Sequence, residues 1–135
     1  MENIITAIKL GAAAIGGVCG ALIGKIDGVL FALLTFMTID YITGIIVACR
    51  RHTLSSEIGF TGLAKKVFIL LLVVVGNVLD VYVIGSGAVV RSAVIAFYLA
   101  NEGLSILENA GNLGVPYPDK LKNVLAQLKD DSDGD

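Results

Sequence analysis

Four long apolar segments are the feature that most constrains the fold of this chain. They cover residues 4–24, 28–49, 67–84 and 89–108, and each approaches the roughly 20 residues that cross a bilayer core of about 30 Å. Hydrophobic residues make up 56% of the chain, more than the about 45–50% of a soluble domain. We therefore predict an all-α integral membrane bundle of about four transmembrane helices within residues 1–110. The alternative, a soluble bundle of wholly buried helices, would leave too little polar surface.

The connections between these segments predict a topology. Residues 25–27 and 85–87 are short enough to join antiparallel helices directly. Residues 50–66 form a longer basic loop, which the positive-inside rule places in the cytoplasm; its basic residues are Arg50, Arg51, Lys65 and Lys66. Four crossings then place both termini in the cytoplasm. Residues 111–135 become a cytoplasmic tail, in which Leu121, Leu125 and Leu128 share one face of a short helix.

The first segment is the least certain of the four spans. It contains small residues at four-residue spacing, Ala12, Gly16, Gly20 and Gly24. Small residues at this spacing let two helix backbones approach closely in lipid, so we expect this face to pack on a helix of the same chain or of a second subunit. Its Gly and Ala content and Lys9 leave open an interfacial or re-entrant segment. A cleaved secretory signal is a further alternative, against which the acidic Glu2 and the single basic Lys9 argue.

Ionisable residues interrupt the apolar segments. Asp40 lies near the middle of the longest one, where a charge facing lipid costs about 2.5–3.5 kcal/mol. Asp80 and Arg91 lie at similar distances on either side of residues 85–87, so we predict that they form an intramembrane ion pair, with Asn77 completing the network. Asp40 and Glu102 have no cationic partner visible in the sequence, and we expect them to meet water or another subunit.

One side of the fourth segment is polar. Together with the apolar Ile95, its members recur at spacings of three and four residues, which places them in one stripe of a helix: Arg91, Tyr98, Glu102, Ser105 and Asn109. We predict that Tyr98, Glu102, Ser105 and Asn109, together with Asp40, face a pore or a neighbouring subunit. The alternative is a hydrogen-bonded seam inside a compact bundle.

Composition argues against several other functions. The net charge of −2 provides no basic face for nucleic acid. Cys19 and Cys49 lie inside apolar segments, and the single histidine, His52, lies in the basic loop, so no metal site is predicted. Neither a phosphate-binding loop nor a paired nucleophile is recognisable. We predict no catalytic residues, no cofactor and no enzymatic activity.

Several stretches resemble the toxin-secretion/phage-lysis holin family. They are residues 40–44 (DYITG), the Ser, Gly and Lys residues between positions 55 and 66, Asp80, residues 97–109 (FYLANEGLSILEN) and residues 114–116 (GVP). The resemblance covers nearly the whole chain, and the first segment departs from it by its Gly and Ala content and Lys9. It implies a small protein of the bacterial cytoplasmic membrane whose homo-oligomers open lesions. Those lesions release a cell-wall hydrolase in phage lysis, or a large toxin.

The leading hypothesis is therefore a pore-forming holin. Its expected partners are further copies of the same chain, membrane lipid and, functionally, a wall hydrolase or toxin. Two other classes remain open at this point. One is a small ion-channel or transporter subunit that uses the same charges in a narrow path. The other is a non-conducting membrane scaffold that binds partners through its tail.

Overall fold

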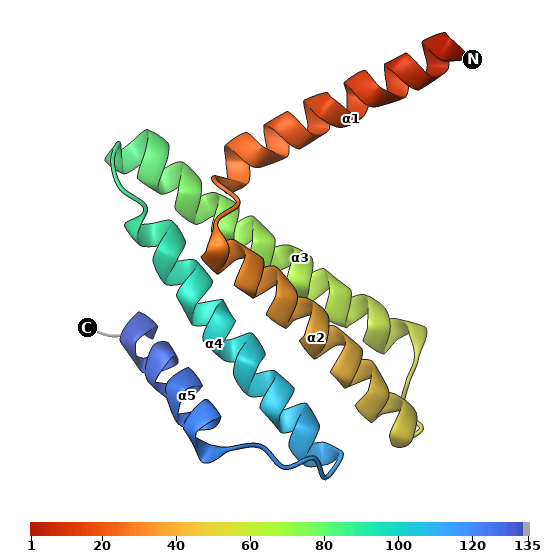
Figure 1. Cartoon of the computed structure of the whole chain (residues 1–135), viewed down its shortest axis with the longest axis vertical. Helices are drawn as coiled ribbons and strands as arrows, with labels where there is room; N and C mark the ends of the chain where they lie inside the picture. The colour runs from red at the N-terminus through yellow and green to blue at the C-terminus, as the bar shows by residue number, and fades with distance from the viewer. Residues whose placement is uncertain (134–135) are drawn as a thin grey trace.

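A computed structural model describes residues 1–133, apart from the side chain of Asp133, and this part of the chain is helical without strands (Figure 1). Four helical stretches are long and apolar enough to cross a membrane, namely α1, α2, α3 with its extension η1, and α4. The predicted fold class is thereby confirmed. The elements are α1 (Glu2–Ile23), α2 (Gly28–Arg50), α3 (Ser56–Val78), the π-helical η1 (Leu79–Ile84), α4 (Val89–Asn112) and α5 (Asp119–Asp133).

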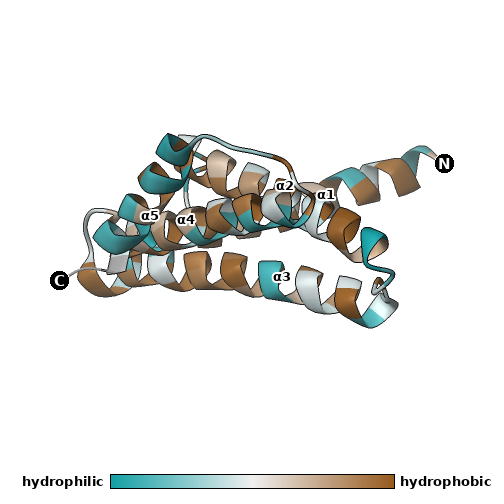
Figure 2. Ribbon diagram, turned by 90° about the horizontal axis from the view of Figure 1, so that it is seen from below, coloured by the Kyte–Doolittle hydropathy of each residue, from teal (hydrophilic) through white to brown (hydrophobic). Residues whose placement is uncertain are grey.

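Helices α2, α3 and α4 form the bundle, and their inward faces make a small apolar core. Leu33 of α2, Val73 of α3 and Ile95 of α4 are almost fully buried there. Many large apolar side chains point outward instead, among them Phe68 and Leu71 of α3. Figure 2 shows hydrophobic residues recurring along α3, whereas α5 is largely hydrophilic. An outer surface of this kind suits lipid rather than water.

Helix α3 begins earlier than the third apolar segment, which was predicted to start at residue 67. We predicted a loop over residues 50–66, but the helix starts at Ser56, and the connection from α2 is short. The Ser55 hydroxyl accepts a hydrogen bond from the backbone N–H of Ile58 (3.2 Å), which satisfies a free donor of the first turn. Glu57 in that turn also favours the helix start. Lys65 and Lys66 therefore belong to a helix rather than to a loop.

Helix α1 leaves the bundle at a large angle (Figure 1), and none of its residues is buried. Side chains built at Gly16 or Gly20 would meet nothing within 4 Å. Gly24, which ends the helix with φ of 88°, lies against Asn77 and Arg91. The small-residue face thus meets the bundle only at its last member, and packing of its other members on a second subunit stays a prediction.

Helix α5 runs back antiparallel along α4 (Figure 1). Of the three leucines predicted to share a face, Leu125 is buried and Leu128 half-buried, whereas Leu121 is exposed. Leu125 packs against Gly103 of α4. The tail helix exists as predicted, and it docks on the bundle.

Candidate functional site

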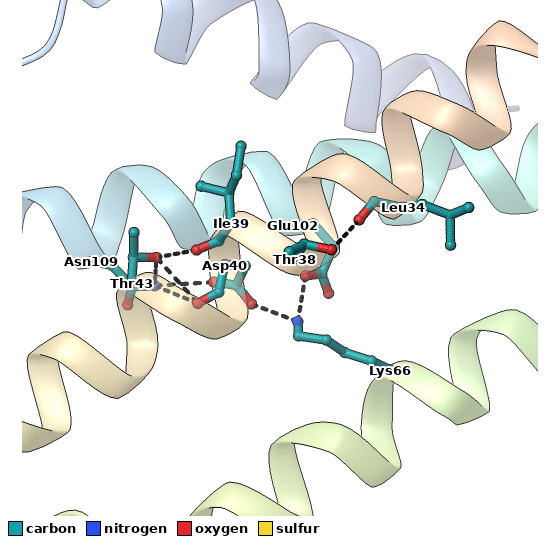
Figure 3. Close-up of polar contacts among 8 residues, drawn as sticks. All are labelled: Leu34, Thr38, Ile39, Asp40, Thr43, Lys66, Glu102 and Asn109. Carbon is teal, nitrogen blue, oxygen red and sulfur yellow. Dashed lines mark hydrogen bonds and ion pairs between the residues drawn. The ribbon is translucent and has the colours of Figure 1, made fainter.

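Three charged side chains from three helices meet inside the bundle. The Lys66 ammonium of α3 donates to Asp40 Oδ2 of α2 (2.8 Å) and to Glu102 Oε2 of α4 (2.6 Å), as Figure 3 shows. All three side chains are at least four-fifths buried. We call Asp40, Lys66 and Glu102 the central cluster.

The central cluster corrects a prediction. Asp40 and Glu102 were expected to lack a cationic partner, and Lys66 was expected at the end of a cytoplasmic loop. Because α3 begins at Ser56, Lys66 is carried on a helix that faces both carboxylates. The ammonium neutralises one of the two negative charges, so the cluster retains a net charge of −1 when all three groups are ionised.

Asn109 links the central cluster to the polar stripe of α4. Its side-chain amide donates to Asp40 Oδ1 (3.1 Å), to the Asp40 backbone carbonyl (3.3 Å) and to Thr43 Oγ1 (2.8 Å) (Figure 3). The Thr43 hydroxyl in turn donates to the Ile39 carbonyl (2.8 Å). Asp40 therefore accepts from both Lys66 and Asn109, which holds α2, α3 and α4 together through polar contacts.

A cavity of about 660 Å³ lies between α2, α3 and α4 beside this cluster. The structure places every residue predicted to face a pore or subunit on its wall: Asp40, Tyr98, Glu102, Ser105 and Asn109. Lys66 and Tyr41, which were not predicted to join these residues, line the same wall. Gly59 and Gly62 of α3 could have indicated Tyr41, because their missing side chains leave room for its ring. Within residues 1–133, no group of His, Cys, Asp and Glu could hold a metal ion.

The predicted ion pair between Asp80 and Arg91 is wrong. The Asp80 carboxylate instead accepts hydrogen bonds from the backbone N–H groups of Val90 (3.0 Å) and Arg91 (2.8 Å). Because α4 starts at Val89, these N–H groups have no partner within the helix, and the positive end of the helix dipole favours a carboxylate there.

The Arg91 guanidinium reaches the end of α1 and the linker that follows. It donates to the carbonyls of Ile23 (3.0 Å) and Lys25 (2.6 Å) and pairs with Asp27 Oδ2 at 3.0 Å. Asn77 was predicted to complete an Asp80–Arg91 network, but its side-chain amide bonds to neither residue and donates instead to the Leu22 carbonyl at the end of α1 (2.9 Å). We call Asp27, Asp80 and Arg91 the terminal cluster.

Asp27 is the member of the terminal cluster that the sequence analysis missed. It directly precedes the second apolar segment, which is the position of a helix N-cap, and its Oδ1 accepts from the backbone N–H of Leu30 (3.0 Å). That hydrogen bond, together with the hydrogen bond and attraction from Arg91, lowers the pKa of Asp27 below its ordinary value. The signal that could have located it is the Asp at the start of an apolar run.

Arg50 and Arg51 lie at the opposite end of the bundle. Arg50 donates to the Leu113 carbonyl (3.1 Å), and Arg51 donates to Asn112 Oδ1 (2.9 Å). Both arginines therefore satisfy groups at the C-terminal end of α4, where a positive charge is favoured. Lys65 is exposed one residue before Lys66.

The model of the bacteriophage holin family matches residues 17–130. The chain belongs to the bacteriophage holin family. A probable holin of Bacillus phage phi105 is 36% identical to it, over 75% of this chain and 74% of that protein. An uncharacterised 14.9 kDa protein in the nagH 3′ region of Clostridium perfringens is 43% identical, over 95% of this chain and 97% of its own length. No solved structure matches the chain.

Membership of the holin family agrees with the four apolar helices and identifies the chain as a membrane protein. The matched range includes every residue of the central and terminal clusters. It starts inside α1, so most of the helix that departs from the bundle precedes the match.

Proposed function

We propose that this holin self-associates in the bacterial cytoplasmic membrane and opens lesions that release a cell-wall hydrolase or a large toxin. Family membership and the probable holin of a Bacillus phage support this function. The central cluster carries the proposal, because it places three charges on three helices that are long and apolar enough to span. A bundle that served only as an anchor would gain nothing from charges that are costly in lipid.

In the closed chain the charges of the central cluster satisfy one another. If α2, α3 and α4 separate, Asp40, Lys66 and Glu102 lose these partners. Exposure of each charged side chain to lipid would then cost about 2.5–3.5 kcal/mol. The separated state is therefore stable only where water or another copy of the chain covers them. In this mechanism the cavity beside the cluster widens into a water-filled surface between subunits.

The membrane potential supplies a trigger for this rearrangement. A charge that moves through the whole field changes in energy by about 2.3 kcal/mol per 100 mV. The net charge of the central cluster couples its position to that field, so collapse of the potential shifts the balance between the closed and open arrangements. We propose that loss of the potential advances lesion formation.

The proposed orientation follows the positive charges. Arg50 and Arg51 lie at the end of the bundle where α2 and α4 terminate, and we place this end in the cytoplasm. The start of α5 then lies on the cytoplasmic side. As the fourth crossing, α1 would return the N-terminus to the cytoplasm.

The test is to co-express the chain with a wall hydrolase that lacks its own export signal. A holin should abolish the membrane potential and release the folded hydrolase, and the cells should lyse. Depolarisation without release would indicate an ion channel instead. If the potential stays intact and the hydrolase stays inside, the proposed function is wrong.

A further inference from the structure

Helix α5 is polar, but it packs against α4, a helix that is apolar enough to span the membrane. Gly103 precedes the end of α4 at Asn112 by nine residues, which is roughly 13 Å at about 1.5 Å per residue. That depth is near the middle of a hydrocarbon core of about 30 Å. Leu125 of α5 packs at this level, so docked α5 lies beside the part of α4 that would be deepest in the bilayer.

Helix α5 is too polar to remain there in lipid. It runs antiparallel to α4 (Figure 1), so the residues after Leu125 lie deeper still, and they include Lys129, Asp130 and Asp131. The charged side chains of α5 form no ion pair among residues 1–132 that would neutralise them. The cost of placing three charges in lipid exceeds what burial of Leu125 and half-burial of Leu128 return.

The surface beneath α5 is shaped to receive a helix. A Cβ added at Gly103 would lie 2.7 Å from a methyl carbon of Leu125 and 3.2 Å from the Phe36 ring of α2. The glycine thus leaves a notch, beside Phe36, into which Leu125 inserts as a knob. We call this surface the Gly103 groove. It already binds one helix along α4, but in the membrane its occupant must be apolar.

We propose that the Gly103 groove is a subunit interface, which a helix of a second copy of this chain occupies when α4 spans the membrane and α5 moves into water. This inference rests on the proposed function, because self-association brings the second copy to the groove. A second copy is the occupant that fits, since it brings apolar helices of the required length and a two-fold axis can join identical faces. Bound α5 and a bound second copy exclude each other.

The first experiment adds bulk to the groove of the full-length chain. Donor- and acceptor-labelled copies are reconstituted in lipid vesicles, and self-association is measured by energy transfer. Gly103→Leu fills the notch and should weaken association about tenfold, as a lost close helix contact would. Gly111→Leu is the matched control, because a side chain there meets nothing within 4 Å, and it should associate as the wild type does. Unchanged association of the Gly103→Leu chain would overturn the proposal.

A second variant separates weaker association from failure of the Gly103→Leu chain to insert into the membrane. Gly103→Ala adds a single methyl group to the same notch and should weaken association less than Gly103→Leu. Both variants are compared at equal amounts in the membrane. A graded loss supports a groove of defined size, whereas equal association of the Gly103→Ala, Gly103→Leu and wild-type chains contradicts it.

The position of α5 is tested separately by cysteine labelling. In a Cys19→Ala, Cys49→Ala chain, Leu125→Cys and Val124→Cys are each treated with a water-soluble maleimide in vesicles. Val124 is exposed and Leu125 is buried while α5 is docked. Undocked α5 should label at both positions at similar rates, and labelling of Leu125→Cys about tenfold slower would overturn the proposal.

Failure of this inference is distinguishable from failure of the proposed function. If the wild type releases hydrolase and Gly103→Leu associates normally, the chain is a holin whose subunits meet elsewhere. If association depends on Gly103 but the wild type releases no hydrolase, the interface stands and the holin function does not.

Discussion

The central and terminal clusters contain the same charges, two carboxylates and one cation, but they are held in different ways. In the terminal cluster, the polar groups bind backbone: Asp80 accepts from the start of α4, Asp27 caps α2, and Arg91 binds carbonyls at the end of α1. In the central cluster, Lys66 binds only side chains, from α2 and α4. The first cluster lies at helix ends, and the second lies beside a cavity.

This difference separates a structural role from a functional one. A carboxylate or guanidinium bonded to free backbone groups at a helix end can leave only if those groups lose their partners, which is costly when they are buried. Side chains that bind one another across three helices can exchange partners when the helices shift and water enters. We therefore propose that the terminal cluster serves the fold and that the central cluster serves the opening of lesions.

The largest effect should come from Arg91→Met. This change removes the buried guanidinium and leaves Asp27 and the carbonyls of Ile23 and Lys25 without their donor. Loss of one partner from a buried charged network costs about 3–5 kcal/mol of stability. The free energy of unfolding of the purified chain in detergent micelles measures it.

Lys9→Met is the control for Arg91→Met, since it removes one positive charge from an exposed position of α1. It should leave the unfolding free energy nearly unchanged. Equal stability of the two variants would show that the backbone contacts of Arg91 do not hold the helix ends together.

The next largest effect should come from Lys66→Met, and it should alter timing more than folding. The change leaves Asp40 and Glu102 facing each other without a cation, which destabilises the closed arrangement by repulsion between two buried carboxylates. Lysis should therefore start earlier after induction at equal protein level. Replacing all three charges, with Asp40→Asn and Glu102→Gln added, should restore a later onset by removing the repulsion.

Lys65→Met removes the neighbouring charge, which is exposed, and should leave the onset of lysis unchanged. If Lys66→Met and Lys65→Met lyse at the same time, the central cluster does not hold the closed arrangement. The proposed role of the central cluster in opening would then be wrong, whereas the structural role of the terminal cluster would stand.

The sequence predicted the helices better than it predicted the contacts between them. Length and hydropathy were sufficient for four apolar helices, because these properties are local to each segment. Spacing also placed Tyr98, Glu102, Ser105 and Asn109 on one side of α4, and the structure brings them to one cavity wall.

The pairing of charges could not be predicted, because it depends on where helices begin. Treating residues 50–66 as a loop hid Lys66 from Asp40 and Glu102, although Ser55 and Glu57 carry a helix-start signal. The ion pair between Arg91 and Asp80 was predicted only because the two residues lie at similar distances from residues 85–87. The backbone N–H groups at the start of α4 and the carbonyls at the end of α1 compete for these side chains, and sequence spacing does not show them.

The smallest expected effect concerns Asp27 and pH. Its pKa is lowered in the folded chain by the Leu30 N–H and by Arg91, so the ionised form stabilises the fold. This contribution is fully present above the unfolded pKa of about 3.9 and is lost as the pH falls through the lower folded pKa. Asp27→Asn keeps a capping side chain but removes the charge.

The measurement is the difference in unfolding free energy between the wild type and Asp27→Asn as a function of pH. The difference should be constant between pH 8 and pH 6, because this range lies well above the unfolded pKa of Asp27, about 3.9, and above its lower folded pKa. It should shrink as the pH falls below about 4. A difference that persists undiminished in acid would mean that the charge of Asp27 contributes nothing. In that case the terminal cluster would be held by Arg91 and its carbonyl partners alone.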